Sequence, residues 1–239
     1  MADAASSNEL LRQREYEHFF ADRGLGGTII RLALSAAGQW VINTPLMRLP
    51  EELRLRPDQH WLDIGCGRAA LLRAIGQRVG FNAPPIGLDF SREALRLARR
   101  DGTDQLGPRL AQGSATALPF ANASFDLVTC GYMLKHLDDD EFLVFLDEVC
   151  RILKGGGLAL IWEYAPSGSD TLDAWNRRLL GAEVRNPHLR SKRTLMHTAR
   201  LAGYELVRDA RLRPFLLPPI PRASIFIGKA PDGWTPPED

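Results

Sequence analysis

The sequence predicts an α/β protein built on a parallel sheet, and three features of the chain support that class. An apolar run from Trp61 to Ile64 leads directly into Gly65 and Gly67. A second apolar run ends at Asp89, and strand-like and helix-like segments alternate beyond it. In a βαβ unit such glycines let the backbone approach a ligand, and the acid can bind both hydroxyls of a ribose. We therefore expect a site for a nucleotide-type cofactor, in particular an adenosine compound.

The elements of the sheet follow from the spacing of apolar residues. Short apolar runs predict strands, and the segments between them repeat apolar residues at helical spacing. Ser91 precedes one helical segment and is expected to cap it. One stripe contains Leu143, Leu146, Val149, Cys150 and Leu153. The predicted strands are 61–64, 85–89, 109–113, 125–130 and 158–162, and the predicted helices are 69–79, 91–100 and 140–153.

The pattern changes after Tyr164. Residues 165–190 contain two prolines and a polar, helix-like run around Trp175, which predicts a lid-like insertion over the site. Residues 191–202 have the pattern of a helix that Gly203 ends, and 205–212 and 223–229 alternate as half-buried strands. We therefore assign 57–239 to one domain.

The N-terminal segment, residues 1–56, is predicted to be a helical extension or cap outside the cofactor fold. Residues 9–21 and 28–39 have helical composition, and the second stretch is apolar on nearly every side. Such a helix can pack on the rim of the sheet or form one wall of a lipophilic acceptor pocket. The sequence leaves both readings open.

Composition narrows the classes of partner. The 239 residues carry 30 basic and 29 acidic side chains, a net charge of +1, and no basic run with interleaved aromatics. Nucleic acid is therefore not expected as a substrate. No stretch approaches the ~20 apolar residues that span a bilayer, and the N-terminus lacks the pattern of a secretion signal. We expect a cytoplasmic protein without stable membrane insertion, and the oligomeric state is unknown.

Metal binding is not expected. Cys66, Cys130 and Cys150 show neither CxxC pairing nor a zinc-like spacing with histidine. The acids at 138–141 precede a predicted helix, where negative charge complements the helix dipole.

Five ordered segments resemble the motifs of class I S-adenosylmethionine-dependent methyltransferases, of the small-molecule type related to ubiquinone and menaquinone methyltransferases. They are Leu62-Asp63-Ile64-Gly65-Cys66-Gly67, Gly87-Leu88-Asp89-Phe90-Ser91, the loop 113–120, Phe125-Asp126-Leu127-Val128 and Leu153-Lys154-Gly155-Gly156-Gly157. The resemblance covers roughly residues 58–165. It implies a Rossmann-like sheet of seven strands in the order 3-2-1-4-5-7-6, with strand 7 antiparallel and helices on both faces. It also implies S-adenosylmethionine as cofactor and a small-molecule methyl acceptor as partner.

The resemblance also implies roles for individual residues in cofactor binding. Asp89 should bind the ribose hydroxyls with Phe90 against adenine, and Asp89→Ala should weaken binding while leaving the fold intact. Ser114 stands where the family usually has an acid facing the adenine amino group, so recognition there must depend on backbone near Ala115. Tyr16 could close over the methionyl carboxylate or be an ordinary residue of an amphipathic helix. The predicted cofactor-binding residues are Tyr16, Asp63, Gly65, Cys66, Gly67, Asp89, Phe90, Ser114, Ala115 and Cys130.

The catalytic candidates are His136 and Glu163. The segment around His136 resembles a His-His-Leu stretch of the family with Lys135 in place of the first His. A base is needed only if the acceptor must lose a proton. His18, Tyr164 and His188 are further polar groups expected near the mouth of the site, each with a plain surface role as the alternative.

The predicted function is methyl transfer to a small apolar or aromatic acceptor by in-line displacement. Two alternatives share parts of the pattern. An NAD(P)-dependent oxidoreductase would also use Gly65, Gly67 and Asp89, although a third glycine at the dinucleotide spacing is missing. A non-catalytic S-adenosylmethionine-binding protein would account for Ser114 and Lys135, which depart from the family pattern.

Overall fold

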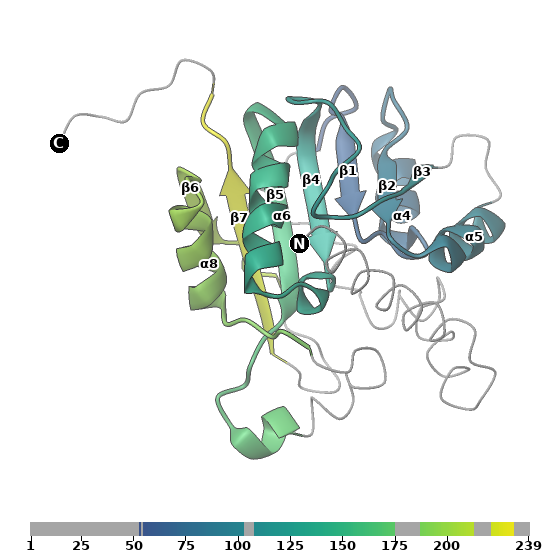
Figure 1. The fold of residues 1–239 in the computed structure, drawn as a ribbon. Coiled ribbons are helices and arrows are strands. Elements are labelled where there is room, and N and C mark those ends of the chain that lie inside the picture. Colours follow the sequence, from purple (N-terminus) through teal and green to yellow (C-terminus); the bar gives the residue numbers. More distant parts are fainter. Residues whose placement is uncertain (1–52, 54, 103–107, 175–186, 213–220, 232–239) are drawn as a thin grey trace, which may run out of the picture.

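The computed structural model describes residues 53, 55–102, 108–174, 187–212 and 221–231. These residues form one seven-stranded sheet in the order β3-β2-β1-β4-β5-β7-β6 (Figure 1). The strands are β1 (Trp61–Ile64), β2 (Ile86–Asp89), β3 (Arg109–Gln112), β4 (Phe125–Gly131), β5 (Leu153–Tyr164), β6 (Leu206–Asp209) and β7 (Arg222–Gly228). Strands β3, β2, β1, β4 and β5 are parallel neighbours, and β7 pairs antiparallel with both β5 and β6. The predicted strand order and the antiparallel seventh strand are confirmed.

Helices cover both faces of the sheet. They are α4 (Ala70–Val79), α5 (Arg92–Asp101), α6 (Asp139–Ile152) and α8 (Lys192–Leu201), with a short 3-10 turn, η2 (Leu134–His136), after β4. Side chains of α6 and α8 form one buried cluster with the sheet, whereas those of α4 and α5 form a second cluster. The chain therefore switches faces between β1 and β4, the place where open α/β sheets bind ligands.

Local sequence signals account for the helix starts. Ser91 accepts a hydrogen bond from the Ala94 backbone N–H at 3.1 Å, as predicted for an N-cap. Ser191 caps α8 in the same way through Thr194. At α6, Asp138 and Glu141 exchange bonds in a capping box, so two acids of the 138–141 cluster are bonded to the helix start.

Two sequence-based expectations need correction. Leu143 was assigned to the buried stripe of α6, but it is 43% exposed, because the buried face turns through Phe142, Phe145 and Ile152 instead. The fifth strand is also longer than predicted. It begins at Leu153, since the glycine-rich stretch already pairs with the start of β4 through an irregular register.

Most of the predicted N-terminal extension and part of the predicted lid lie outside the described residues. Leu53 belongs to the extension, and it is buried in the cluster that contains Trp61 and the inner faces of α4 and α5. Within the described ranges, no helix combines the length and apolar character needed to cross a membrane.

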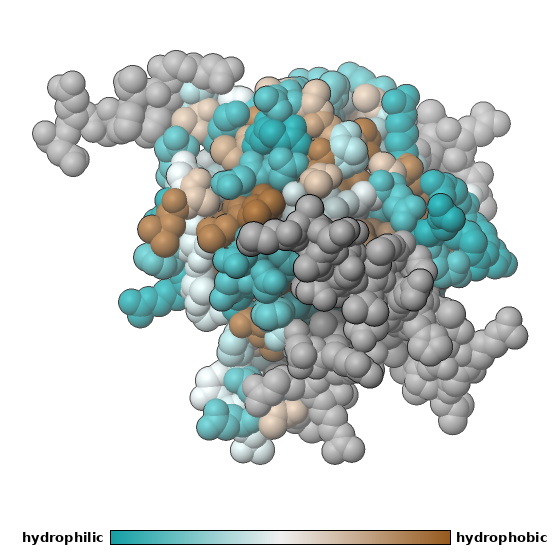
Figure 2. All heavy atoms as spheres, viewed as in Figure 1, coloured by the Kyte–Doolittle hydropathy of each residue, from teal (hydrophilic) through white to brown (hydrophobic). Residues whose placement is uncertain are grey.

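The outer face that carries α6 and α8 is largely hydrophilic, with hydrophobic residues gathered in places between the hydrophilic ones (Figure 2). The large apolar side chains exposed among the described residues are Leu143, Val144, Leu201 and Leu206.

Gly76→Ala is expected to raise the free energy of unfolding by about 0.5–1 kcal/mol. Gly76 lies inside α4, where glycine is destabilising relative to alanine because the unfolded chain loses more entropy. The added Cβ would lie 3.6 Å from Pro85, an ordinary contact distance. Urea denaturation of both proteins checks this, and a lower midpoint for the variant would contradict it.

Candidate functional site

The predicted cofactor residues converge at the carboxyl ends of the central strands. Gly65 follows β1, Asp89 is the last residue of β2, and Gly131 is the last residue of β4. Because β1 pairs with β2 on one side and β4 on the other, these three positions lie along one edge of the sheet.

The two glycines of the turn that follows β1 meet different structural requirements. Gly65 and Gly67 adopt φ angles of 73° and 52°, which disfavour side chains with a Cβ. A Cβ on Gly65 would lie 2.8 Å from Cβ of Met133, so this glycine lets the segment after β4 pack on the turn. Among the residues that the structure describes, a Cβ on Gly67 would meet nothing within 4 Å, so the backbone there borders open space in this part of the structure. Of the two, Gly67 is the glycine that leaves room for a ligand.

Asp89 joins the glycine turn to the start of α5. Its Oδ2 accepts the Gly67 backbone N–H at 2.7 Å, and its Oδ1 accepts the Ser91 N–H at 2.8 Å. The side chain is buried, and this burial raises the pKa of Asp89 to about 6 against the effect of these bonds. Asp89 therefore shapes the turn in addition to any contact with ribose.

Asp63 links β1 to β4 beneath the turn. Its Oδ1 accepts a hydrogen bond from the Thr129 hydroxyl at 2.6 Å, and that hydroxyl accepts one from Nε1 of Trp61 at 2.9 Å. Burial raises the pKa of Asp63 to about 7, and the nearby charge of Asp89 adds to the rise. No local pattern indicates Thr129 as the partner of Asp63, because the pairing depends on the register of β1 with β4.

We expect the free energy of unfolding to fall between about pH 4 and pH 7, and Asp63→Asn to flatten that slope. The folded-state pKa of Asp63, about 7, lies above its ordinary value of 3.8. The native state then binds more protons in this window, so the stabilisation is complete below about pH 4 and is lost as the pH rises through 7. Urea denaturation at several pH values measures the two slopes. Equal slopes would show that Asp63 is ionised in the native state throughout.

The two cysteines predicted near the cofactor lie in different parts of the core. Cys66 is in the cluster on the α4 side, and Cys130 is fully buried in the cluster on the α6 side. The two thiols therefore belong to opposite sides of the sheet core. Burial raises the pKa of both thiols, which opposes a role as nucleophile.

In the loop predicted to face adenine, the polar groups of Ser114 and Thr116 hydrogen-bond to each other. The Ser114 hydroxyl lies 2.8 Å from that of Thr116 and also accepts the Thr116 N–H. Ala115 is partly buried, and Phe90 is partly exposed at the end of β2. The loop start is tied to β2, because the Gly113 N–H bonds to the Asp89 carbonyl at 3.2 Å.

A cluster of aromatic residues lies at the carboxyl ends of β4 and β5, on the same edge of the sheet as the glycine turn. Tyr132 and Tyr164 stack with ring centroids 4.5 Å apart, and the Trp162 ring meets Tyr132 edge-on at 6.4 Å. Tyr132 has a φ of 55°, which is uncommon for an aromatic residue, and strained backbone positions of this kind cluster at functional sites. The Arg222 guanidinium lies over the Tyr132 ring, 5.4 Å from its centre.

Glu163 and Lys135 are buried beside this stack. The Glu163 carboxylate accepts the Lys135 N–H at 2.9 Å and the Tyr164 N–H at 2.8 Å. The Lys135 ammonium donates to the Tyr132 carbonyl and lies 5.6 Å from the Tyr164 ring centre. In the sequence, Lys135 is only a departure from the family pattern. No local signal indicates that its side chain is buried.

The remaining candidates are placed as follows. His136 is partly buried at the end of η2. The backbone N–H of His188 bonds to the Lys135 carbonyl, while the His188 side chain is exposed. Tyr16 and His18 lie outside the described residues. Within the part of the chain that is described, no three His, Cys, Asp or Glu side chains converge as a metal site would require.

The geometry fits an adenosine cofactor. Open space borders the backbone at Gly67, and the Asp89 carboxylate lies against the same turn, as binding of a ribose beside the turn requires.

Comparison with known proteins agrees with this geometry. Residues 62–157 match the family described as methyltransferase domain. Demethylmenaquinone methyltransferase from Staphylococcus carnosus is 34% identical over 116 residues, which cover 48% of this chain and 47% of the relative. The enzyme of the same name from Alkalihalophilus pseudofirmus is 33% identical over 115 residues, covering 47% and 48%. The chain thus spans about half the length of the curated relatives that it matches.

Solved structures share the fold. An S-adenosylmethionine-dependent methyltransferase from Thermotoga maritima has a TM-score of 0.62 at 20% identity, covering 90% of this chain and 99% of that one. Phosphoethanolamine N-methyltransferase 2 from Haemonchus contortus, in complex with S-adenosyl-L-methionine, has a TM-score of 0.58 at 17% identity, covering 84% and 58%.

The strand order, the glycine turn and the acid at the end of β2 define a Rossmann-like methyltransferase architecture. Taken with the family match, they identify residues 62–157 as a methyltransferase domain with the fold of class I S-adenosylmethionine-dependent methyltransferases. The cofactor of this class is S-adenosylmethionine. The match is to methyltransferases, not to the nicotinamide oxidoreductases that the glycine pattern also allowed.

Proposed function

We propose that this protein transfers the methyl group of S-adenosylmethionine to a small aromatic acceptor. The observation that carries the choice of acceptor is the stacked pair Tyr132 and Tyr164, 4.5 Å apart at the edge where the cofactor turn lies. Met133, next to Tyr132, packs on Gly65, so the aromatic pair follows directly from the segment that covers the turn. Flat aromatic faces favour a flat acceptor. The curated relatives named above, which act on demethylmenaquinone by name, agree with this class.

The residues at the turn would hold the cofactor. We propose that the Asp89 carboxylate binds the ribose hydroxyls, that the backbone at Gly67 borders the methionyl part, and that residues 113–115 meet adenine. Both Asp89 oxygens already accept one backbone N–H each, and a carboxylate oxygen can accept a further bond. Ionised Asp63 and Asp89 would favour the positive sulfonium. The affinity for S-adenosylmethionine should therefore rise as the pH rises through their raised pKa values, about 7 and about 6.

The bound cofactor supplies a methyl group that its sulfonium already activates. The protein's own contribution is alignment, since holding two reactants in attack geometry can contribute about 7–11 kcal/mol. Glu163 supports that alignment by fixing the backbone of Lys135 and Tyr164. With both oxygens engaged in this way, Glu163 suits positioning better than proton transfer, and we retain His136 as the candidate base.

The test compares acceptors on the full chain. We expect release of S-adenosylhomocysteine with hydroxylated naphthalenes or quinols and little with aliphatic alcohols or amines. Tyr164→Leu should lower kcat/KM for the aromatic acceptor about tenfold, or about 1.4 kcal/mol, and leave affinity for S-adenosylhomocysteine unchanged. Phe81→Leu is the matched control, because Phe81 pairs with Trp61 away from this cluster.

Two outcomes would overturn the proposal. Tight binding of S-adenosylhomocysteine with no turnover of any acceptor would favour the non-catalytic cofactor-binding protein. Faster turnover of aliphatic than of aromatic acceptors would reject the aromatic class while keeping the methyltransferase.

A further inference from the structure

We propose that Glu148 and Arg151 of α6 are positioning residues for the cofactor: they hold the loop 113–122 in the shape that recognises adenine. The inference rests on the adenine contact proposed above for residues 113–115. It does not depend on the acceptor or on turnover.

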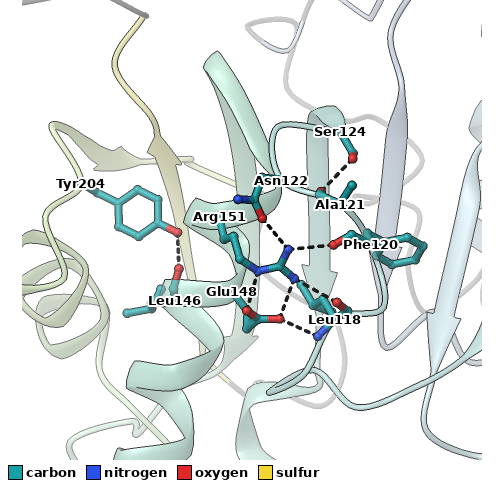
Figure 3. Close-up of polar contacts among 9 residues, drawn as sticks. All are labelled: Leu118, Phe120, Ala121, Asn122, Ser124, Leu146, Glu148, Arg151 and Tyr204. Carbon is teal, nitrogen blue, oxygen red and sulfur yellow. Dashed lines mark hydrogen bonds and ion pairs between the residues drawn. The ribbon is translucent and has the colours of Figure 1, made fainter.

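The contacts form a compact network between one helix and one loop (Figure 3). Nη1 of Arg151 donates to the Phe120 carbonyl at 2.7 Å and to Oδ1 of Asn122 at 2.9 Å. Nη2 donates to the Leu118 carbonyl at 2.9 Å. The other side of the guanidinium pairs with both carboxylate oxygens of Glu148, at 2.7 and 2.9 Å.

Glu148 also bonds directly to the backbone of the loop. Its Oε2 accepts the Leu118 N–H at 2.6 Å, so both the N–H and the carbonyl of Leu118 are bonded to the pair. Each of these bonds involves a charged group, and such bonds are shorter and stronger than neutral ones. A planar guanidinium suits this task because its donors are fixed in direction, which a lysine ammonium cannot reproduce.

The loop needs such an anchor because it has little structure of its own. Its start is tied to β2 through Gly113, and a single bridge joins Ser114 to Ala117. The clamp formed by Glu148 and Arg151 fixes the other end, so residues 114 and 115 lie between two anchors.

Because Ser114 is neutral, recognition of adenine depends more on the backbone of this loop. Its hydroxyl is engaged with Thr116, and it brings no charge toward adenine. Discrimination of the adenine amino group then depends on where the backbone near Ala115 lies. We infer that α6 sets this position through Arg151.

The test is equilibrium binding of two ligands to the full chain, without any acceptor. The ligands are S-adenosylhomocysteine and S-inosylhomocysteine, which carries an oxygen in place of the adenine amino group. We expect the native protein to prefer the first. Arg151→Ala should weaken S-adenosylhomocysteine about tenfold and S-inosylhomocysteine much less, so that the preference collapses. A loss of stability alone would leave the ratio of the two dissociation constants unchanged.

Milder variants keep the inference testable if Arg151→Ala does not fold. Arg151→Lys retains the charge beside Glu148 but not the fork, and should fall between the native protein and the alanine variant. Asn122→Ala removes one contact and should shift the ratio slightly in the same direction. The control is Arg96→Ala, because Arg96 pairs with Glu93 on α5 in the same i, i+3 arrangement, at 2.6 and 2.7 Å, away from the loop.

The outcomes separate this inference from the proposed function. A preference that survives in folded Arg151→Ala and Arg151→Lys would overturn the positioning role, even if methyl transfer were observed. A collapse of the preference would support the role even if no acceptor were turned over.

Discussion

Asp89→Ala is expected to abolish tight cofactor binding and to lower the free energy of unfolding by about 2–6 kcal/mol. The carboxylate is buried and accepts the backbone N–H groups of Gly67 and Ser91. Its removal leaves two donors without an acceptor, at about 1–3 kcal/mol each, and frees the turn. Burial therefore corrects the sequence-based expectation that the fold would be unaffected. Calorimetry with S-adenosylhomocysteine and urea denaturation measure the two effects.

Two further variants define the origin of these effects. Asp89→Asn keeps one acceptor and should lie between the native protein and the alanine variant. Asp209→Ala is the matched control, since Asp209 ends β6 and accepts the N–H of Arg211 at 3.0 Å, two residues on, as Asp89 does with Ser91. Four strands separate β6 from β2, so this variant should leave cofactor binding unchanged. Native affinity in Asp89→Ala would reject the assigned role.

Gly131→Ala is expected to lower the free energy of unfolding by about 2–3 kcal/mol, because the new Cβ would overlap three atoms of the Trp162 indole. Gly131 and Trp162 are register partners on β4 and β5, and the indole is buried. The ring therefore cannot move aside without disturbing the core and the neighbouring Tyr132. Thermal or urea unfolding measures the loss.

A double mutant identifies the cause of this loss. If the clash is responsible, Gly131→Ala should destabilise the Trp162→Leu protein far less than it destabilises the native one. Gly102→Ala should change stability by less than about 0.5 kcal/mol, since Gly102 has a φ of −84° and, among the described residues, its Cβ would come no closer than 3.6 Å to another atom, the Ala98 carbonyl oxygen. Similar losses in both backgrounds would place the cause elsewhere.

Local signals predicted the cofactor side of the candidate site better than the acceptor side. Gly65, Gly67 and Asp89 lie in short motifs whose geometry follows from strand, turn and helix in succession. The proposed acceptor side brings together Tyr132, Lys135, Glu163, Tyr164 and Arg222. These residues come from three separate segments of the chain, and only the register of β5 with β4 and β7 makes the segments neighbours.

The sequence by itself determined the class of this protein, because periodicity, caps and turns are properties of neighbouring residues. The glycine turn and the cap at Ser91 were predictable in this way, whereas the strand order was implied by the resemblance of the five motifs to a known family. Only the tertiary structure decided how side chains meet across elements. It buried Asp89, joined Asp63 to Thr129, and set Arg151 against the loop at Leu118. The physical reason is that burial and hydrogen-bond geometry depend on packing between segments far apart in the chain, which no local pattern encodes.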